Sequence, residues 1–359
     1  MDSEVSTAAT PDSDTSELGQ HPFAFSGNAR EYFQIWIVNV LLTILTLGIY
    51  SAWAKVRTTR YFYGNTSVAG DSFEYHAKPL TILRGRAIAV AVLAIYVLAS
   101  NFVPAVSIIL FLLISFGAPW LIVQALRFRA AMSSWRNVRF SFLGDIGGAI
   151  GVYWFAPILG VVTLGLGMPY VWYSQTQYTV DNHRFGNTLF NMNASPGSFY
   201  VIALVVAAVG ALILLALGII FGTVMAMTGG AELLEEDPES LLVNLLVLIP
   251  IAMAYSAIYA LYKGLRFRVV YNNLQLNDSF VRNRIGIGRF VWISLTNSIA
   301  ILLTLGLAYP WAKVRMTAYL VNSMTLYATD LDRFVSDSTT EESATGDEIG
   351  EAFDLGLGI

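Results

Sequence analysis

Apolar residues fill seven long segments of the chain, and short polar segments separate them. Four of these segments contain no charged side chain over most of their length, and each is long enough to cross a hydrocarbon core of about 30 Å as a helix. The four predicted spans cover residues of about 84–102, 104–126, 199–228 and 241–262. The other three segments lie in 31–61, 146–178 and 289–326, and each is interrupted by glycine. The pattern predicts an all-α polytopic membrane protein.

The three glycine-interrupted segments share a sequence. TLGIYSAWAKVRTTRY at 46–61 returns as TLGLAYPWAKVRMTAY at 304–319, which is 258 residues later, and TLGLGMPYVWYSQTQY at 163–178 keeps only the beginning. Glycine weakens a helix and permits a bend, so we expect Gly48 and Gly306 to mark the same backbone break. Repeated units determine an architecture, and these predict an internal repeat.

The repeat divides the chain into predicted blocks. A first block at 23–145 and a second block at 146–288 each join one bent unit to two spans, and a third bent unit follows at 289–326. Segments 1–22 and 332–359 are acidic and poor in hydrophobic residues, which predicts disordered tails. Polar segments with turn signals, such as Gly64-Asn65 and Gly70-Asp71, predict short cytoplasmic β-hairpin-like segments.

The distribution of basic residues gives a topology. If the three bent units re-enter the membrane from the cytoplasmic side and only the four spans cross, none of the 21 Lys and Arg residues lies outside. The positive-inside rule favours this arrangement, with both termini cytoplasmic. Seven full spans are the alternative, and they would leave many basic residues outside. A re-entrant backbone must be buried in protein or line a cavity, so the bent units should pack against the spans.

Composition agrees with a membrane protein, because 55% of the residues are hydrophobic, 13% are charged and the mean hydropathy is +0.59. Soluble domains carry about 25% charged residues. The chain has no cysteine and no recognisable catalytic or phosphate-binding motif, and its three histidines are far apart. These features predict no enzyme activity, no metal, no cofactor and no nucleic-acid binding. The four spans lack ionisable side chains, which argues against proton-coupled transport.

An aromatic and basic collar follows the bend in two units. Tryptophan with cations just beyond it is typical of a membrane–water boundary, where lysine and arginine extend toward lipid phosphates. A dedicated site for anionic lipid is the sharper interpretation. Two asparagines at equivalent depth are either hydrogen-bonded between helices or line a cavity. The collar candidates are Trp53, Lys55, Arg57, Trp311, Lys313 and Arg315, and the cavity candidates are Asn39 and Asn297.

The FxFxG start at 23–27, the TLGxxxxWAKVR core, the YGNT that follows it and the LRFR element resemble the YjgN-like family over about 23–326. The middle unit departs from the motif with YVWYS. The resemblance implies a multi-pass bacterial inner-membrane protein of uncharacterised function, and it supplies no substrate or catalytic residue. A transporter or channel is one hypothesis. A non-transporting scaffold or a protein that interacts with anionic lipid is the alternative, and a lipid-modifying enzyme ranks last. The sequence leaves the oligomeric state open.

Overall fold

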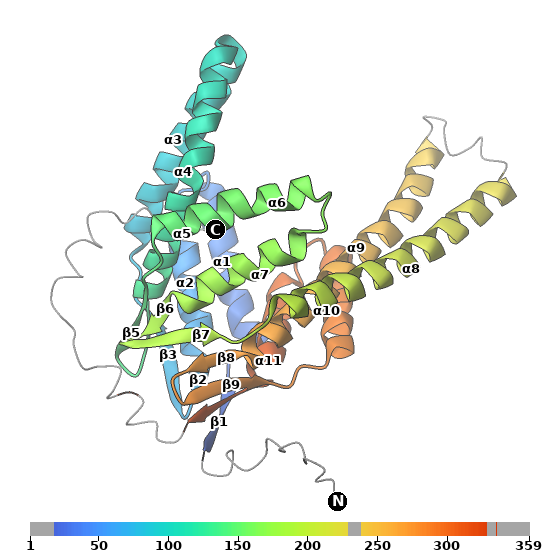
Figure 1. The fold of residues 1–359 in the computed structure, drawn as a ribbon. Helices are drawn as coiled ribbons and strands as arrows, with labels where there is room; N and C mark the ends of the chain where they lie inside the picture. The colour runs from blue at the N-terminus through green and yellow to red at the C-terminus, as the bar shows by residue number, and fades with distance from the viewer. Residues whose placement is uncertain (1–17, 229–237, 329–334, 336–359) are drawn as a thin grey trace, which may run out of the picture.

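Ten short strands close into one antiparallel barrel in the computed structural model, which describes residues 18–228, 238–328 and 335 (Figure 1). This barrel overturns the prediction of an all-α fold, because the segments expected to be separate hairpins pair with one another around a closed ring. The order around the ring is β1-β10-β9-β8-β7-β6-β5-β4-β3-β2. The strands are β1 (Gly19–Phe25), β2 (Thr66–Val68), β3 (Asp71–Tyr75), β4 (Ser133–Trp135), β5 (Val138–Phe142), β6 (His183–Phe185), β7 (Thr188–Met192), β8 (Leu274–Leu276), β9 (Ser279–Asn283) and β10 (Met324–Ala328).

Tight turns join the strands of each hairpin, and pairings between strands far apart in the chain close the ring. Two-residue turns join β2 to β3 and β4 to β5, and Gly70 and Asn137 in these turns have positive φ angles of 87° and 62°. Positive φ is what short hairpin turns require. The remaining closure pairs β1 with β10, where Gly19 lies opposite Ala328. A barrel leaves no unpaired strand edge, so even strands of three residues are stable in it. Strand β1 begins at Gly19, inside the segment predicted to be disordered.

Helices connect the strands in pairs, and the order strand, helix, helix, strand occurs five times. Each pair leaves the barrel and returns to it, so each predicted bent unit is two helices joined by a reversal and not one continuous helix. The pairs are α1 (Ala29–Leu45) with α2 (Ser51–Gly64), α3 (Pro79–Phe102) with α4 (Pro104–Ala131), α5, η1 and α6 (Ile146–Ile150, Gly151–Phe155 and Ala156–Val162) with α7 (Met168–Asp181), α8 (Pro196–Thr228) with α9 (Pro238–Asn272), and α10 (Ile287–Leu303) with α11 (Tyr309–Val321).

Two of the pairs are long and three are short. Helices α3, α4, α8 and α9 are long and apolar enough to cross a membrane, which confirms the four predicted spans by length and composition. They form two separate pairs, α3 with α4 and α8 with α9, which extend away from the barrel in different directions (Figure 1). Helices α1 and α10 have 17 residues each. At about 1.5 Å per residue they reach roughly 26 Å, which is less than the hydrocarbon thickness.

The three short pairs reverse direction in the same way. Gly48, Gly165 and Gly306 all have a φ of +93°. The leucine before each glycine also has a positive φ, between 49° and 52°, and is more than nine-tenths exposed at the tip of its turn. The prediction that Gly48 and Gly306 mark the same backbone break is confirmed, and the middle unit shares it. We name these reversals, residues 46–50, 163–167 and 304–308, the TLG turns.

Tyrosines tie the short pairs to the barrel rim. The Tyr61 hydroxyl donates to the Asn28 carbonyl and accepts from its N–H, both at 2.9 Å. Tyr319 makes the same two bonds with Gly286, and the Tyr178 hydroxyl donates to the Asp145 carbonyl. In each pair the first, outgoing helix leaves the barrel and the second, returning helix leads back to it. Each tyrosine therefore holds the returning helix against the start of the outgoing helix. Residues 229–237 and the predicted tails, apart from residues 18–22 and 335, lie outside the described residues.

Candidate functional site at the mouth of the barrel

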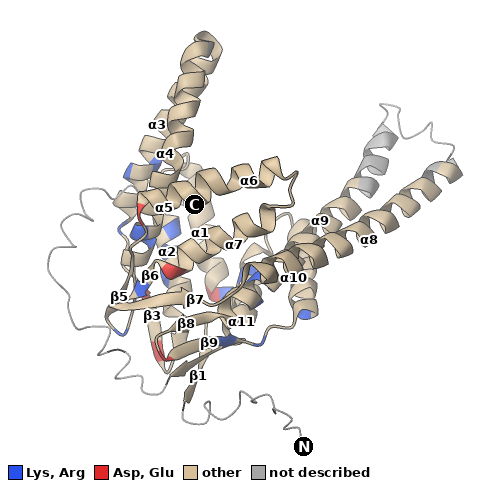
Figure 2. Cartoon of the chain, viewed as in Figure 1, with Lys and Arg blue, Asp and Glu red and all other residues tan. Residues whose placement is uncertain are grey.

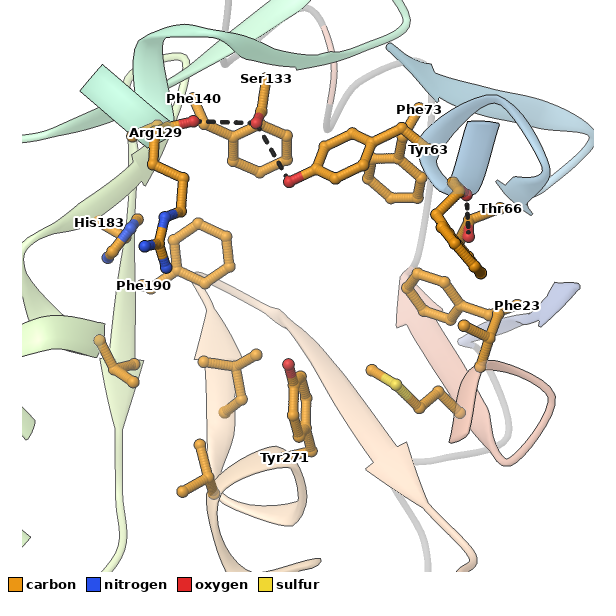
Figure 3. A pocket seen from close by; sticks show the side chains of 17 residues that line it. Phe23, Tyr63, Thr66, Phe73, Arg129, Ser133, Phe140, His183, Phe190 and Tyr271 are labelled. Atoms are coloured by element: carbon orange, nitrogen blue, oxygen red, sulfur yellow. Dashed lines mark hydrogen bonds between the residues drawn. The ribbon is translucent and has the colours of Figure 1, made fainter. Parts of the chain in front are cut away.

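The barrel encloses a cavity of about 530 Å³, which we call the chamber (Figure 3). The residues that line the chamber occupy equivalent positions in successive strands and helices. One phenylalanine comes from each of four odd-numbered strands, one residue from the start of each even-numbered strand, and one from the last turn of each returning helix. These residues are Phe23, Phe73, Phe140 and Phe190; Thr66, Ser133, His183, Leu274 and Met324; and Tyr63, Ala130, Val180, Tyr271 and Val321; Phe62, Arg129 and Val270 complete the lining.

Five buried apolar side chains close the chamber on the side away from the helices. Each is the third residue of an even-numbered strand, and together they belong to one core cluster. The Trp135 ring lies 5.7 Å from the ring of Phe185, between centroids. The last turns of the helices line the opposite side, which we call the mouth of the chamber. The floor residues are Val68, Trp135, Phe185, Leu276 and Leu326.

Polar groups of the chamber lie at its mouth. The Ser133 hydroxyl donates to the Arg129 carbonyl at 3.0 Å and can accept from the Tyr63 hydroxyl, which lies 3.3 Å away. The side chain of Arg129 lies beside His183, with Phe190 next to them (Figure 3). Burial lowers the pKa of His183, and the positive charge of Arg129 lowers this pKa further. His183 is therefore neutral at physiological pH, and Arg129 brings the positive charge to this side of the mouth.

Two predicted collar lysines lie together next to the mouth. The Lys313 ammonium is 3.4 Å from the Tyr32 hydroxyl and 4.7 Å from the ring centroid of Phe62, which lines the chamber. Partial burial lowers the pKa of Lys313, and repulsion from Lys55 lowers it further. Partial burial also lowers the pKa of Lys55, with added repulsion from Arg129 and then Arg86. Four helices thus bring four cations together, and we call Lys55, Arg86, Arg129 and Lys313 the basic cluster.

The predicted arginines and asparagines take different roles in the two units. Arg315 donates to the Thr296 hydroxyl at 2.7 Å and to the Asn297 side-chain oxygen at 3.0 Å, and it lies over the Trp311 ring at 5.0 Å. Asn297 also donates to the Ala312 carbonyl. Arg57 is instead exposed. The same backbone break therefore does not give the same side-chain contacts.

Asn39 is 4% exposed, and both polar atoms of its amide lack a partner among the described residues. Neither Asn39 nor Asn297 is among the chamber-lining residues. Asn39 is buried on α1, and Asn297 bonds to α11, the other helix of its pair. Trp53 packs against the core cluster of Ala52 and Val56, whereas Trp311 is exposed. The predicted collar is thus divided: Lys313 lies near the chamber-lining Phe62 and Arg315 is bound inside its own unit, whereas Lys55 and Arg57 are exposed.

Sequence reasoning missed the chamber and two members of the basic cluster. The signal for the chamber was a phenylalanine six residues before the start of four outgoing helices, as with Phe73 before Pro79 and Phe140 before Ile146. The signal for Arg129 was its place in the LRFR element, whose depth in the fold depends on the barrel.

One further cluster of polar side chains carries no recognisable chemistry. The imidazole Nε2 of His76 contacts both the Ser134 hydroxyl, at 2.7 Å, and Glu74, at 3.5 Å. A nucleophile relay would use both ring nitrogens, so these contacts are not those of a catalytic triad. Over residues 18–228, 238–328 and 335, no group of three His, Cys, Asp or Glu side chains could hold a metal ion.

The chain matches a family described as "Bacterial protein of unknown function (DUF898)" over residues 20–352. The chain belongs to this family. It is similar to the inner membrane protein YjgN of Escherichia coli K12, with 36% identity over 156 residues, or 42% of this chain and 38% of the relative. It is also similar to YjgN of Salmonella typhimurium LT2, with 26% identity over 369 residues, or 87% of this chain and 89% of the relative. No solved structure matches the chain.

The YjgN-like resemblance predicted from the sequence motifs is therefore confirmed. The relatives are inner membrane proteins, and with the four apolar helices they support a membrane protein. The match to the E. coli relative spans about two-fifths of that protein's length, so no function of that relative is assigned to this chain.

Proposed function

We propose that this protein binds anionic lipid of the bacterial inner membrane at the basic cluster. The observation that carries the proposal is the position of basic side chains beside the chamber: Arg129 lines it, and the Lys313 ammonium stands 4.7 Å from the ring centroid of Phe62, which also lines it. Within the described part of the chain, neither Lys55 nor Lys313 has a carboxylate at ion-pair distance. Like charges held together without a counter-charge favour an anionic ligand, and a lipid phosphate supplies one.

The position of the basic cluster in the fold supports the proposal. Arg86 lies in the second turn of α3 and Arg129 in the last turn of α4, so both are at the barrel ends of the long helices. Lys and Arg gather at these ends, and the outer halves of α3 and α4 carry none (Figure 2). If the long helices cross the bilayer, the basic cluster lies at the depth of the headgroups, where each cation contributes about 1 kcal/mol of attraction to anionic lipid.

Replacing Lys55 and Lys313 together by glutamine tests this proposal, because glutamine keeps most of each stem and removes the charge. At about 1 kcal/mol for each charge, affinity for vesicles containing phosphatidylglycerol should fall by roughly 25-fold. The purified variants would be titrated against vesicles of graded anionic content. Lys263→Gln is the control, since it removes one cation that lies over the Tyr259 ring, outside the basic cluster. Equal affinity of wild type and the double variant would refute the proposal.

The proposal also includes the orientation of the barrel relative to the membrane. The positive-inside rule places the barrel and both termini in the cytoplasm, with the tips of the two long pairs at the periplasmic face.

The five strand–helix–helix–strand segments would then be copies of one unit, alternately short and long, so that the three short pairs insert into the bilayer without crossing it. Matching TLG turns and tyrosine ties support this internal repeat.

Labelling of introduced cysteines tests the orientation in this cysteine-free chain. Asn101 lies at the outer end of α3 and Ser72 on β3, and both are exposed. We expect a membrane-impermeant thiol reagent to label Asn101→Cys in intact spheroplasts and to label Ser72→Cys only after lysis. The reverse pattern would place the barrel in the periplasm.

Transport remains the alternative prediction from the sequence. The apolar floor of the chamber closes the barrel at the position where a path along its axis would pass. Lipid binding requires no opening there, and we therefore favour it over a channel.

A further inference from the structure

We propose that the chamber holds one acyl chain of an anionic lipid or fatty acid, with its charged group at the basic cluster. This inference rests on the proposed lipid binding and adds a specific occupant to a cavity that this binding does not require. Two features carry it: an apolar chamber with a closed floor, and positive charge at its mouth.

The chamber has the size and surface of a ligand site. Its volume of about 530 Å³ is within the range of roughly 300–1,000 Å³ that is typical of small-molecule pockets. Phenylalanines from four strands surround it, and the nearest side chains beneath them belong to the buried floor. Water in such a cavity would lack the polar partners that it needs, so an apolar chain is the better occupant.

The mouth determines which kind of apolar molecule fits. Arg129 lines the chamber, and the Lys313 ammonium stands 4.7 Å from the ring of Phe62, which also lines it. Lys55 lies close enough to both to lower the pKa of Lys313 and to have its own pKa lowered by Arg129. A molecule with its tail at the floor would therefore place its head among cations. Charge complementarity points to an anionic amphiphile with a single chain in the barrel.

The position of the mouth agrees with a lipid source. Tyr63, Val180 and Val321 line the chamber from the last turns of returning helices, so its mouth faces the helix pairs. If those pairs sit in the bilayer, a chain enters the chamber without crossing water. The same chemistry could come from a free fatty acid or from a phospholipid chain, and these two sources are separated by the experiment below.

Filling the chamber tests the inference. Val180→Phe and Val321→Phe each add a ring to the lining from a different helix, and Val162→Phe adds the same ring at a site that is 74% exposed on α6. Binding would be measured in detergent with a fatty acid brominated near its methyl end, which quenches nearby tryptophan fluorescence. We expect at least a tenfold loss of affinity for each chamber variant and no change for Val162→Phe. Gel filtration and circular dichroism would confirm folding, and wild-type binding by both folded chamber variants would overturn the inference.

The position of the chain end and the role of the charge are tested separately. Trp135 lies in the floor, so Trp135→Phe should remove most of the quenching without loss of binding measured by equilibrium dialysis. Retained quenching in this variant would place the chain outside the chamber and overturn the inference. The Lys55→Gln and Lys313→Gln double variant should weaken binding of the acid but leave the corresponding fatty alcohol unaffected. Chamber binding of the alcohol together with unchanged vesicle binding by the double variant would refute the proposed function alone.

Two further measurements determine which molecule supplies the acyl chain and whether a segment of this protein occupies the chamber instead. Mass spectrometry of lipid extracted from the purified protein would show bound fatty acid or phospholipid, and both support the inference. Val180→Phe should lose that lipid, whereas Val162→Phe should keep it. Val335 packs against the floor cluster, so a variant that ends at residue 328 tests whether the chain's own C-terminal segment fills the chamber. Binding of the brominated acid only after this truncation would identify that segment as the occupant and overturn the inference.

Discussion

Replacing Trp135 by alanine is expected to destabilise the protein by about 3–5 kcal/mol, the range for removing a large buried aromatic side chain. Trp135 is 3% exposed, and its indole N–H donates at 3.1 Å to the carbonyl of Asp71, the first residue of the neighbouring strand β3. Its ring packs in the floor against Phe185 and lies near Phe73. Alanine would leave a cavity where five strands converge and would leave the Asp71 carbonyl without its indole donor. Thermal unfolding in detergent, followed by circular dichroism and by gel filtration of the folded fraction, would measure the loss.

Trp292→Ala is the matched control for this prediction. Trp292 lies on α10 and is 64% exposed, so its loss creates no internal cavity. Its effect should stay within about 0.5 kcal/mol, as for surface substitutions in general. If the two variants unfold at the same temperature, the barrel floor contributes nothing to stability. In that case the helices, and not the barrel, hold the described part of the chain together.

The helices could be predicted from the sequence because their signal is local and long. An apolar run of about 20 residues suffices to predict a span, and all four predicted spans are apolar helices in the structure. The barrel could not be predicted in this way. Its strands have three to seven residues, and strands on either side of a helix pair are tens of residues apart in the chain. Alternation in HPFAF or VRFSF is visible, yet only the need to pair every strand edge brings these segments into one ring.

The candidate site was predicted in part for a related reason. The matched WAKVR motifs correctly indicated that Lys55 and Lys313 have equivalent places in the sequence, and the structure brings them together. Arg86 and Arg129 belong to the same cluster, but they come from a long pair with no such motif. Their position depends on the ring, in which the long pair between β3 and β4 stands next to the short pair between β1 and β2. Sequence spacing does not give that adjacency.

Replacing the threonine of each TLG turn by valine, in Thr46→Val, Thr163→Val and Thr304→Val, is expected to destabilise the protein by roughly 1–3 kcal/mol at each turn. The turns have a complete set of backbone partners, because all six N–H groups from residue 46 to residue 51 have acceptors, and so do those of 163–168 and 304–309. One acceptor in each turn is the threonine hydroxyl, which takes the N–H of Tyr50, Gly167 or Ala308 at 2.7–2.9 Å. Valine keeps the shape of threonine and leaves that N–H unpaired.

The environment of the turns makes this loss costly. Leu47, Leu164 and Leu305 are the most exposed large apolar side chains described, at 93–95%, which is where a bilayer would cover them. In hydrocarbon no water replaces the lost acceptor, and an unpaired N–H costs several kcal/mol. The control is Thr43→Val, because the Thr43 hydroxyl only donates to the Asn39 carbonyl and accepts no backbone N–H in α1. Unfolding would be compared in lipid nanodiscs and in detergent. Equal stability of Thr43→Val and Thr46→Val would show that the hydroxyl is dispensable, whereas a greater loss for Thr46→Val in nanodiscs would place the turn in the hydrocarbon.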